Sequence, residues 1–124
     1  MEISDTDIHL KKFQKELNAG IVSLVLLATL AAAREPLYGY QIAKLLEPDG
    51  EEAGSVKQGT LYPVLRALSS AGLLESYVEP SVSGPPRRYY RITDDGHALL
   101  AEWKRAWIRT RNFVDSVLGD SEHE

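Results

Sequence analysis

The chain has 124 residues, of which 26% are charged, and it contains no cysteine. This length suits a single domain with a buried core, and the lack of cysteine excludes disulfides and thiolate chemistry. The net charge is −4, yet residues 57–111 hold nine basic and five acidic side chains, whereas residues 112–124 hold four acidic and no basic ones. Because the distribution of charge matters more than its sum, the acidic total does not exclude binding to nucleic acid.

The first third of the chain predicts a loose polar tail over residues 1–10, followed by a long helix from Lys11. Residues 17–33 carry no charge. They therefore approach the length of a transmembrane span, and with the lysines before them they also imitate a secretory signal. Alanine, glycine, serine and threonine make this run only mildly hydrophobic. We expect a helix buried by its own domain and by a partner chain, with a membrane-anchored regulator as an alternative.

A second helix is predicted after Pro36, which ends the first because proline disfavours helix at the residue before it. This second helix covers residues 38–46 and turns Ile42 and Leu45 towards the core. A Pro-Asp-Gly sequence stops it. The acidic loop over residues 47–54 is longer than the tight turn of a minimal helix-turn-helix, and its role stays open.

Residues 56–74 predict a short amphipathic helix, because Leu61, Val64, Leu65 and Leu68 recur with a period near 3.6. Its outer face is basic and rich in hydrogen-bonding groups. Such a helix suits the major groove, where side chains at the N-terminal end reach base edges; an ordinary surface helix is the alternative. Gly72 is expected to end the helix in a left-handed cap.

Two strands, Leu74 to Glu79 and Arg87 to Ile92, predict a hairpin with a proline-rich tip. The second strand alternates, so Arg87 and Tyr89 lie on one face and Arg88 and Tyr90 on the other. We expect Tyr90 and Ile92 to pack on the core. The arginines would contact phosphate, with a solvated strand face as the alternative.

A last helix is predicted from the N-cap Thr93 to about Leu118. Its apolar stripe is too wide to be covered by one small domain, which indicates a partner helix. The predicted dimer-interface residues are Leu99, Leu100, Trp103, Trp107, Phe113, Val114 and Val117.

Three segments in register carry a recognisable pattern: Leu37-Tyr38-Gly39-Tyr40-Gln41-Ile42, then Gly59-Thr60-Leu61-Tyr62-Pro63-Val64-Leu65 with Gly72-Leu73-Leu74, and Arg88-Tyr89-Tyr90-Arg91-Ile92-Thr93-Asp94-Asp95-Gly96. Together they resemble the PadR-type transcriptional regulators, which are winged helix-turn-helix proteins. Members of that family often open the third helix with Ser-Pro. This chain has Lys57-Gln58 there, which leaves Ser55 as the candidate N-cap.

The predicted fold is therefore α+β and mostly helical. A winged helix-turn-helix covers residues 1–92, and a long dimerisation helix with an acidic tail covers residues 93–124. The predicted DNA-binding residues are Tyr38, Lys44, Lys57, Gln58, Thr60, Tyr62, Arg66, Arg87 and Arg88.

The predicted function is sequence-specific binding of a palindromic operator by a cytoplasmic homodimer, acting as a repressor that a small effector releases. The resemblance implies an aromatic-lined cavity between subunits, so Trp103 and Trp107 are candidates for contact with a small aromatic or hydrophobic effector. The three histidines lack metal-ligand spacing, and no phosphate loop or nucleophile motif is present, so we expect no enzyme, metal or cofactor. The alternative function is a dimeric protein-interaction module of the same fold without DNA binding.

Overall fold

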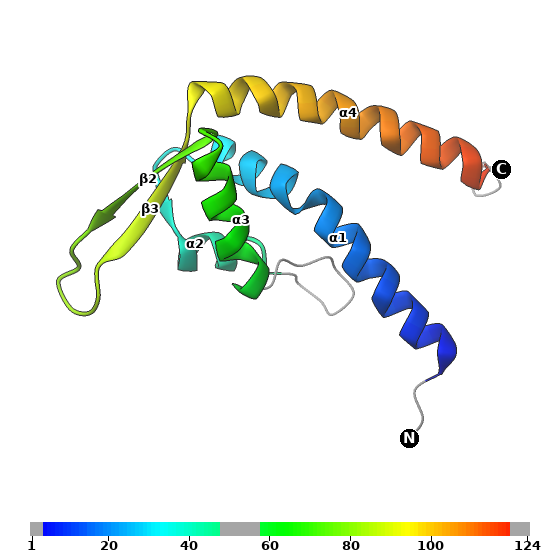
Figure 1. Cartoon of the computed structure of the whole chain (residues 1–124), viewed down its shortest axis with the longest axis horizontal. Helices are drawn as coiled ribbons and strands as arrows, with labels where there is room; N and C mark the ends of the chain where they lie inside the picture. The colour runs from blue at the N-terminus through cyan, green and yellow to red at the C-terminus, as the bar shows by residue number, and fades with distance from the viewer. Residues whose placement is uncertain (1–3, 48–57, 120–124) are drawn as a thin grey trace.

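The computed structural model describes residues 4–47 and 58–119 (Figure 1). Within these residues the chain forms four helices and a three-stranded antiparallel sheet. The elements in chain order are α1 (Asp5–Ala32), β1 (Leu37–Tyr38), α2 (Gly39–Leu45), α3 (Gln58–Ser70), β2 (Leu74–Glu79), β3 (Arg87–Ile92) and α4 (Asp94–Leu118). This mostly helical α+β arrangement confirms the predicted fold class. The acidic segment after Glu47, with the candidate N-cap Ser55, lies outside the described residues.

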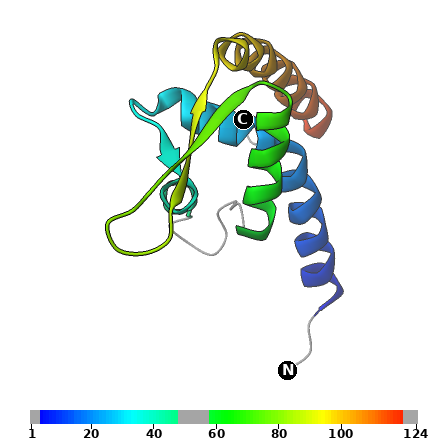
Figure 2. The ribbon, with the colours of Figure 1, turned by 60° about the vertical axis from the view of Figure 1, so that its left-hand side comes forward.

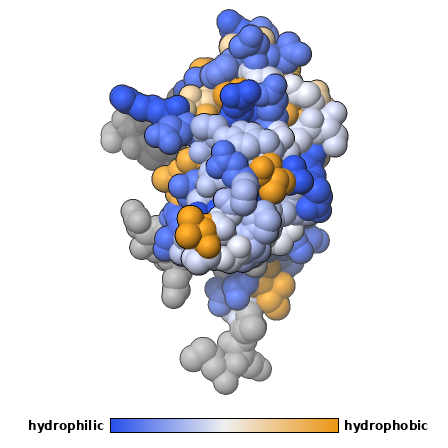
Figure 3. Space-filling view, turned by 90° about the vertical axis from the view of Figure 1, so that its left-hand side faces the viewer, coloured by the Kyte–Doolittle hydropathy of each residue, from blue (hydrophilic) through white to orange (hydrophobic). Residues whose placement is uncertain are grey.

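The sheet has the strand order β1-β3-β2, with β3 in the centre. The predicted hairpin of β2 and β3 is confirmed, and Figure 2 shows it projecting from the helices as a twisted ribbon. Seen from the wing side, the surface is largely hydrophilic, with hydrophobic residues scattered singly (Figure 3). The third strand was not predicted: Leu37 and Tyr38 pair with Tyr90 and Tyr89 of β3, so α2 begins at Gly39 rather than at residue 38.

The first helix begins earlier than the sequence suggested, at Asp5 rather than at Lys11. The hydroxyl of Ser4 accepts a hydrogen bond from the Asp7 amide at 3.1 Å, and the acidic residues of the first turn favour the positive end of the helix dipole. The prediction of a loose tail over residues 1–10 is therefore wrong from Asp5 onward.

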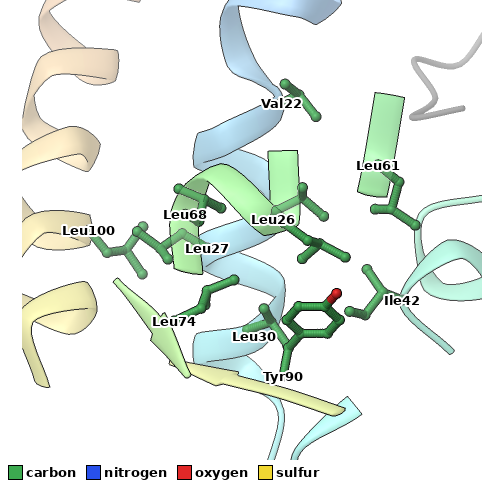
Figure 4. Packing of buried hydrophobic residues seen from close by; sticks show 11 residues of the cluster. Val22, Leu26, Leu27, Leu30, Ile42, Leu61, Leu68, Leu74, Tyr90 and Leu100 are labelled. Atoms are coloured by element: carbon green, nitrogen blue, oxygen red, sulfur yellow. The ribbon is translucent and has the colours of Figure 1, made fainter. Parts of the chain in front are cut away.

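The core lies between the second half of α1, α3 and the inner face of the sheet (Figure 4). Its fully buried members are Leu26, Leu27, Ile42, Leu61 and Leu65. Tyr90 is also buried, and Ile92 packs against the core, as the alternation in β3 predicted. Leu45 was expected in the core, but its side chain is 62% exposed because α2 ends at this residue after only seven residues.

By length and composition, α1 passes as a candidate membrane span among the described residues. Core helices can have the same length and composition. Here Val22, Leu26, Leu27 and Leu30 of α1 are buried, and the helix packs against α3, α4 and β3. These contacts bury one face of the uncharged run, and 22% of its apolar window is buried within the domain.

Gly72 and Thr93 fix the two ends of the hairpin to the helices. Gly72 adopts φ 82°, and the Leu73 amide donates to the Leu68 carbonyl at 3.0 Å, which is the predicted left-handed cap of α3. The Thr93 hydroxyl accepts from the Gly96 amide at 2.9 Å and donates to the Gly72 carbonyl at 2.8 Å. The N-cap role predicted for Thr93 is thus confirmed.

Only the first turns of α4 dock on the rest of the chain. Leu100, a predicted dimer-interface residue, is 4% exposed and belongs to the core of its own chain, which leaves almost none of its side chain for a partner. Trp103, one turn further, packs against the same core. Beyond it, α4 extends away from the wing on the same side as the N-terminal half of α1 (Figure 1).

Candidate nucleic-acid interface

The outer face of α3 presents the side chains that sequence reasoning assigned to base reading. Because Leu61, Leu65 and Leu68 are buried, the helical repeat turns Thr60 and Arg66 to solvent, and both are exposed. Lys57 lies outside the described residues, as does the side chain of Gln58, the first residue of α3. Thr60 and Arg66 are thus two predicted DNA-binding residues whose side chains are exposed.

Tyr62 also lies on α3, but its ring is partly engaged. Its side chain is 37% exposed, and the ring packs against Gly39, where an added Cβ would collide with three of its atoms. Gly39 is buried at the start of α2. The contact therefore joins the first helix of the helix-turn-helix to the second, and Tyr62 presents only part of its ring to solvent.

The two wing arginines lie on opposite faces of the sheet, because successive side chains of a strand alternate. Arg88 is on the face of Tyr90, which is the buried face. Its guanidinium donates to the Ser76 hydroxyl of β2 at 3.0 Å. Arg87 is on the face of Tyr89, away from the core.

Tyr90 of β3 lies in the core cluster together with Leu61, Leu65 and Leu68 of α3. Burial raises the pKa of Tyr90, while the positive charges of Arg88 and Arg66 act in the opposite direction. Tyr90 therefore packs in the same core as α3, on the face of β3 that also carries Arg88.

The remaining predicted DNA-binding residues contact other side chains of the same chain. Lys44 forms an ion pair with Glu47, with 3.4 Å between Nζ and Oε1, so a phosphate would have to compete with a carboxylate for it. Tyr38 and Arg87 contact each other on the outer face of the sheet, with the guanidinium carbon 4.4 Å from the ring centroid. Arg88 thus lies on the face of the sheet that packs on the core, whereas Tyr38 and Arg87 contact each other on the outer face.

The sequence model of the PadR-like transcriptional regulator family matches residues 26–102. The chain belongs to this family. It is 37% identical over 92 residues to the transcriptional regulator Rv3488 of Mycobacterium tuberculosis, covering 74% of this chain and 79% of that protein. A PadR family transcriptional regulator from Eggerthella lenta has a similar solved structure, with a TM-score of 0.79, 35% identity, and coverage of 92% and 96% of the two chains. A PadR-like regulator from Bacillus cereus matches with a TM-score of 0.66, 30% identity, and coverage of 84% and 97%.

The resemblance carried by the three sequence motifs is therefore confirmed, and the protein is a PadR-like winged helix DNA-binding regulator. Its described residues contain no group of three or more His, Asp or Glu side chains that could hold a metal ion. Sequence reasoning missed two residues that contact predicted DNA-binding side chains: Gly39 lies against Tyr62, and Ser76 accepts from Arg88. Gly39 belongs to the first of the three family motifs, but nothing in the sequence indicates which side chain packs against it. The alternation of β2 with β3 could have placed Ser76 beside Arg88.

This PadR-like regulator also exposes an apolar face on its two projecting helices. On α4, Phe113 is 66% exposed and Val117 is 68% exposed. On α1, Phe13 is 59% exposed, and Leu10, which the sequence placed in the loose tail, is 60% exposed. Between the helices lies an open groove of about 510 Å³. Its lining includes Leu17, Ile21, Leu24, Trp103 and Trp107.

Proposed function

We propose that this regulator is a cytoplasmic homodimer that binds a palindromic operator in double-stranded DNA and represses transcription until a small aromatic or hydrophobic effector releases it. The observation that supports the DNA-binding part is the exposed face of α3 with Thr60 and Arg66, beside a wing whose strand β2 packs against α3 and whose strand β3 carries Arg88. A guanidinium from the reading helix and one from the wing can engage the same duplex, one at base edges and one at phosphate.

Specificity comes from the start and the outer face of α3. Thr60 and Arg66 have exposed side chains there, and Arg is the commonest side chain to recognise guanine by two hydrogen bonds. Lys57, Gln58 and Tyr62 complete the proposed reading set. Arg88 contacts phosphate from the wing, and Lys44 from α2 after leaving Glu47.

The proposed dimer rests on the exposed apolar face of α1 and α4. Monomers rarely expose large contiguous apolar patches, and here the second half of α4 carries several exposed large apolar side chains. They are Trp107, Ile108, Phe113, Val114, Val117 and Leu118. Trp107, Phe113, Val114 and Val117 are predicted interface residues, and α1 adds Ile8, Leu10 and Phe13. A second copy, related by a two-fold axis, would cover both helices.

The proposed effector site is the groove between these helices. Trp103 and Trp107 line one wall of it, and aliphatic residues of α1 line the other. Indole rings offer flat surfaces on which an aromatic or hydrophobic molecule stacks. Because the groove is open in one chain, the partner would have to close it, which would link effector binding to the dimer.

A mobility-shift titration with DNA from immediately upstream of the protein's own gene tests the proposed function. The regulator should bind this DNA more tightly than random DNA of equal length, and Thr60→Ala or Arg66→Ala should reduce that preference. Arg105→Ala is a matched control because Arg105 pairs with Glu102 on α4 at 2.7 Å, and it should leave binding unchanged. If the intact chain binds neither DNA at low salt, the interaction-module alternative becomes the better account.

A further inference from the structure

The outer face of the sheet carries a row of three tyrosines, one from each strand. Tyr38 of β1 and Tyr77 of β2 are both in register with Tyr89 of β3. The rings of Tyr77 and Tyr89 are stacked with centroids 5.7 Å apart, and Tyr38 meets Tyr89 edge-on at 5.4 Å. Aromatic pairs across strands stabilise a sheet beyond the area they bury, so this row holds both strands of the wing to β1.

Arg87 closes one end of this row. Its guanidinium lies over the Tyr38 ring at 4.4 Å, within the range of a cation–π interaction. Tyr40 is stacked beside Tyr38 at 6.5 Å. Arg87 therefore has an aromatic partner on the outer face of the sheet. Its neighbour Arg88 has a hydrogen-bond partner, Ser76, on the opposite face.

Tyr38 is also tied to the helix-turn-helix through its backbone. Its amide donates to the Gln41 side-chain oxygen in the first turn of α2 at 3.0 Å. The next residue, Gly39, accommodates the Tyr62 ring of α3. Tyr38 thus lies between the wing, which it contacts through Tyr89 and Arg87, and Gly39, against which α3 packs through Tyr62.

We propose that Tyr38 and Arg87 are positioning residues that set the wing relative to α3, and that neither contacts DNA. The contact of Arg87 with Tyr38 holds β3 against β1, and Arg88 then lies on the opposite face of β3 with Ser76, the face that packs on the core shared with α3. The proposal rests on the proposed DNA-binding function, and it moves two residues from the predicted contact list to a supporting role. Arg88 is then the phosphate-binding arginine of the wing.

The salt dependence of DNA binding separates a positioning arginine from a contacting one. Each lost phosphate contact changes the slope of log affinity against log salt by about 0.9. Arg88→Gln should flatten the slope by about 2 in a dimer. Arg87→Gln should lower affinity about fivefold at every salt concentration, the order expected from two exposed cation–π pairs, and leave the slope unchanged. An equal flattening by both variants would overturn the proposal.

Conservative variants test the ring and the charge separately. Tyr38→Phe keeps the ring but removes the hydroxyl that a phosphate contact would use, so its affinity should stay within about twofold of the parent. Arg87→Lys keeps a cation over the ring and should recover most of the affinity lost in Arg87→Gln. If Tyr38→Phe weakens DNA binding as much as Tyr38→Leu does, the hydroxyl contacts DNA and the proposal is wrong.

A measurement without DNA distinguishes failure of this proposal from failure of the proposed function. Amide hydrogen exchange of the full-length chain should quicken across β1 and β3 in Arg87→Gln and in Tyr38→Leu, but not in Arg88→Gln, whose lost bond to Ser76 joins only β2 to β3. An intact chain that binds no DNA would contradict the proposed function. The exchange experiment would still show whether the contact between Arg87 and Tyr38 stabilises the sheet. Unchanged exchange in both Arg87→Gln and Tyr38→Leu would overturn the proposed positioning role of these two residues.

Discussion

Gly39 of α2 leaves the space that the ring of Tyr62 in α3 occupies. A Cβ at Gly39 would collide with the ring, although the ring is 37% exposed and can swing outward. Gly39→Ala should therefore cost little stability but displace Tyr62 and lower operator affinity by on the order of 1 kcal/mol, or about fivefold. Urea unfolding and DNA titration of the same preparation measure the two effects.

The control for Gly39→Ala is the same change in a Tyr62→Ala background. Without the ring there is no collision, so the added methyl group should have no further effect on affinity. Equal losses in both backgrounds would mean that Gly39 acts on DNA binding without Tyr62.

Gly96 in the first turn of α4 should be less tolerant than Gly39. A Cβ at Gly96 would collide with the Leu73 carbonyl oxygen and with Ile92. That carbonyl cannot move freely because it accepts from the Thr93 amide at 3.1 Å. Gly96→Ala should lower the free energy of unfolding by about 1–3 kcal/mol. In Gly59→Ala the added Cβ meets nothing within 4 Å, and this control should keep or gain stability when both are unfolded at equal protein concentration.

Much of the fold could be predicted from the sequence because its elements have strong local signals. The apolar period in α3, the alternation in β3 and the N-cap Thr93 each fixed an element, and the structure confirms all three. The two-residue strand β1 could not be predicted, because so short a strand has no periodicity and exists only by pairing with β3. The sequence does contain a signal for the Ser4 cap, because a serine followed by an acidic first turn is typical of a helix N-terminus.

The candidate site was predictable as a set of residues but not as an arrangement. Alternation in β3 showed that Arg87 and Arg88 differ in direction, yet it could not show that a tyrosine 49 positions earlier along the chain lies under Arg87. The stripe on α4 likewise mixed two environments. Leu100 and Phe113 are both apolar residues on one helix, but the sequence does not say where the domain beneath the helix ends. The structure buries the first and exposes the second.

Operator binding should weaken steeply with salt. A dimer with about three phosphate contacts per subunit should show a slope near −5 in log affinity against log salt. A titration from low to physiological salt at constant pH measures it. Affinity that stays flat over this range would contradict a phosphate-based interface, whatever the preference for sequence.

Pro63 lies inside α3 and is exposed. Proline cannot donate the helical hydrogen bond to the carbonyl four residues earlier and crowds it, which bends a helix. Pro63→Ala should preserve or raise the free energy of unfolding, since alanine is the better helix former, while it changes operator affinity because the bend sets how α3 enters the groove. Thermal unfolding with parallel DNA titration tests this. Unchanged affinity would show that the bend has no part in docking.

The second half of α4 should be the element that makes the dimer, and a symmetric dimer requires a symmetric operator. A two-fold axis through the α4 pair would set the two copies of α3 about one DNA turn apart, roughly 34 Å, facing two inverted half-sites. Phe113→Ala with Val117→Ala removes two side chains that contribute nothing to the core of their own chain, so the monomer should stay folded. Sedimentation equilibrium should show a weakened dimer, and operator affinity should fall with it. Leu45→Ala, which removes an equally exposed apolar side chain elsewhere, should neither weaken the dimer nor lower operator affinity.

Trp107→Ala should act like the α4 pair, whereas Trp103→Ala, on the wall of the groove, should chiefly change the response to an effector. A Phe113/Val117 double variant that sediments as a monomer yet binds the palindrome at full affinity would break the link between this helix and the operator.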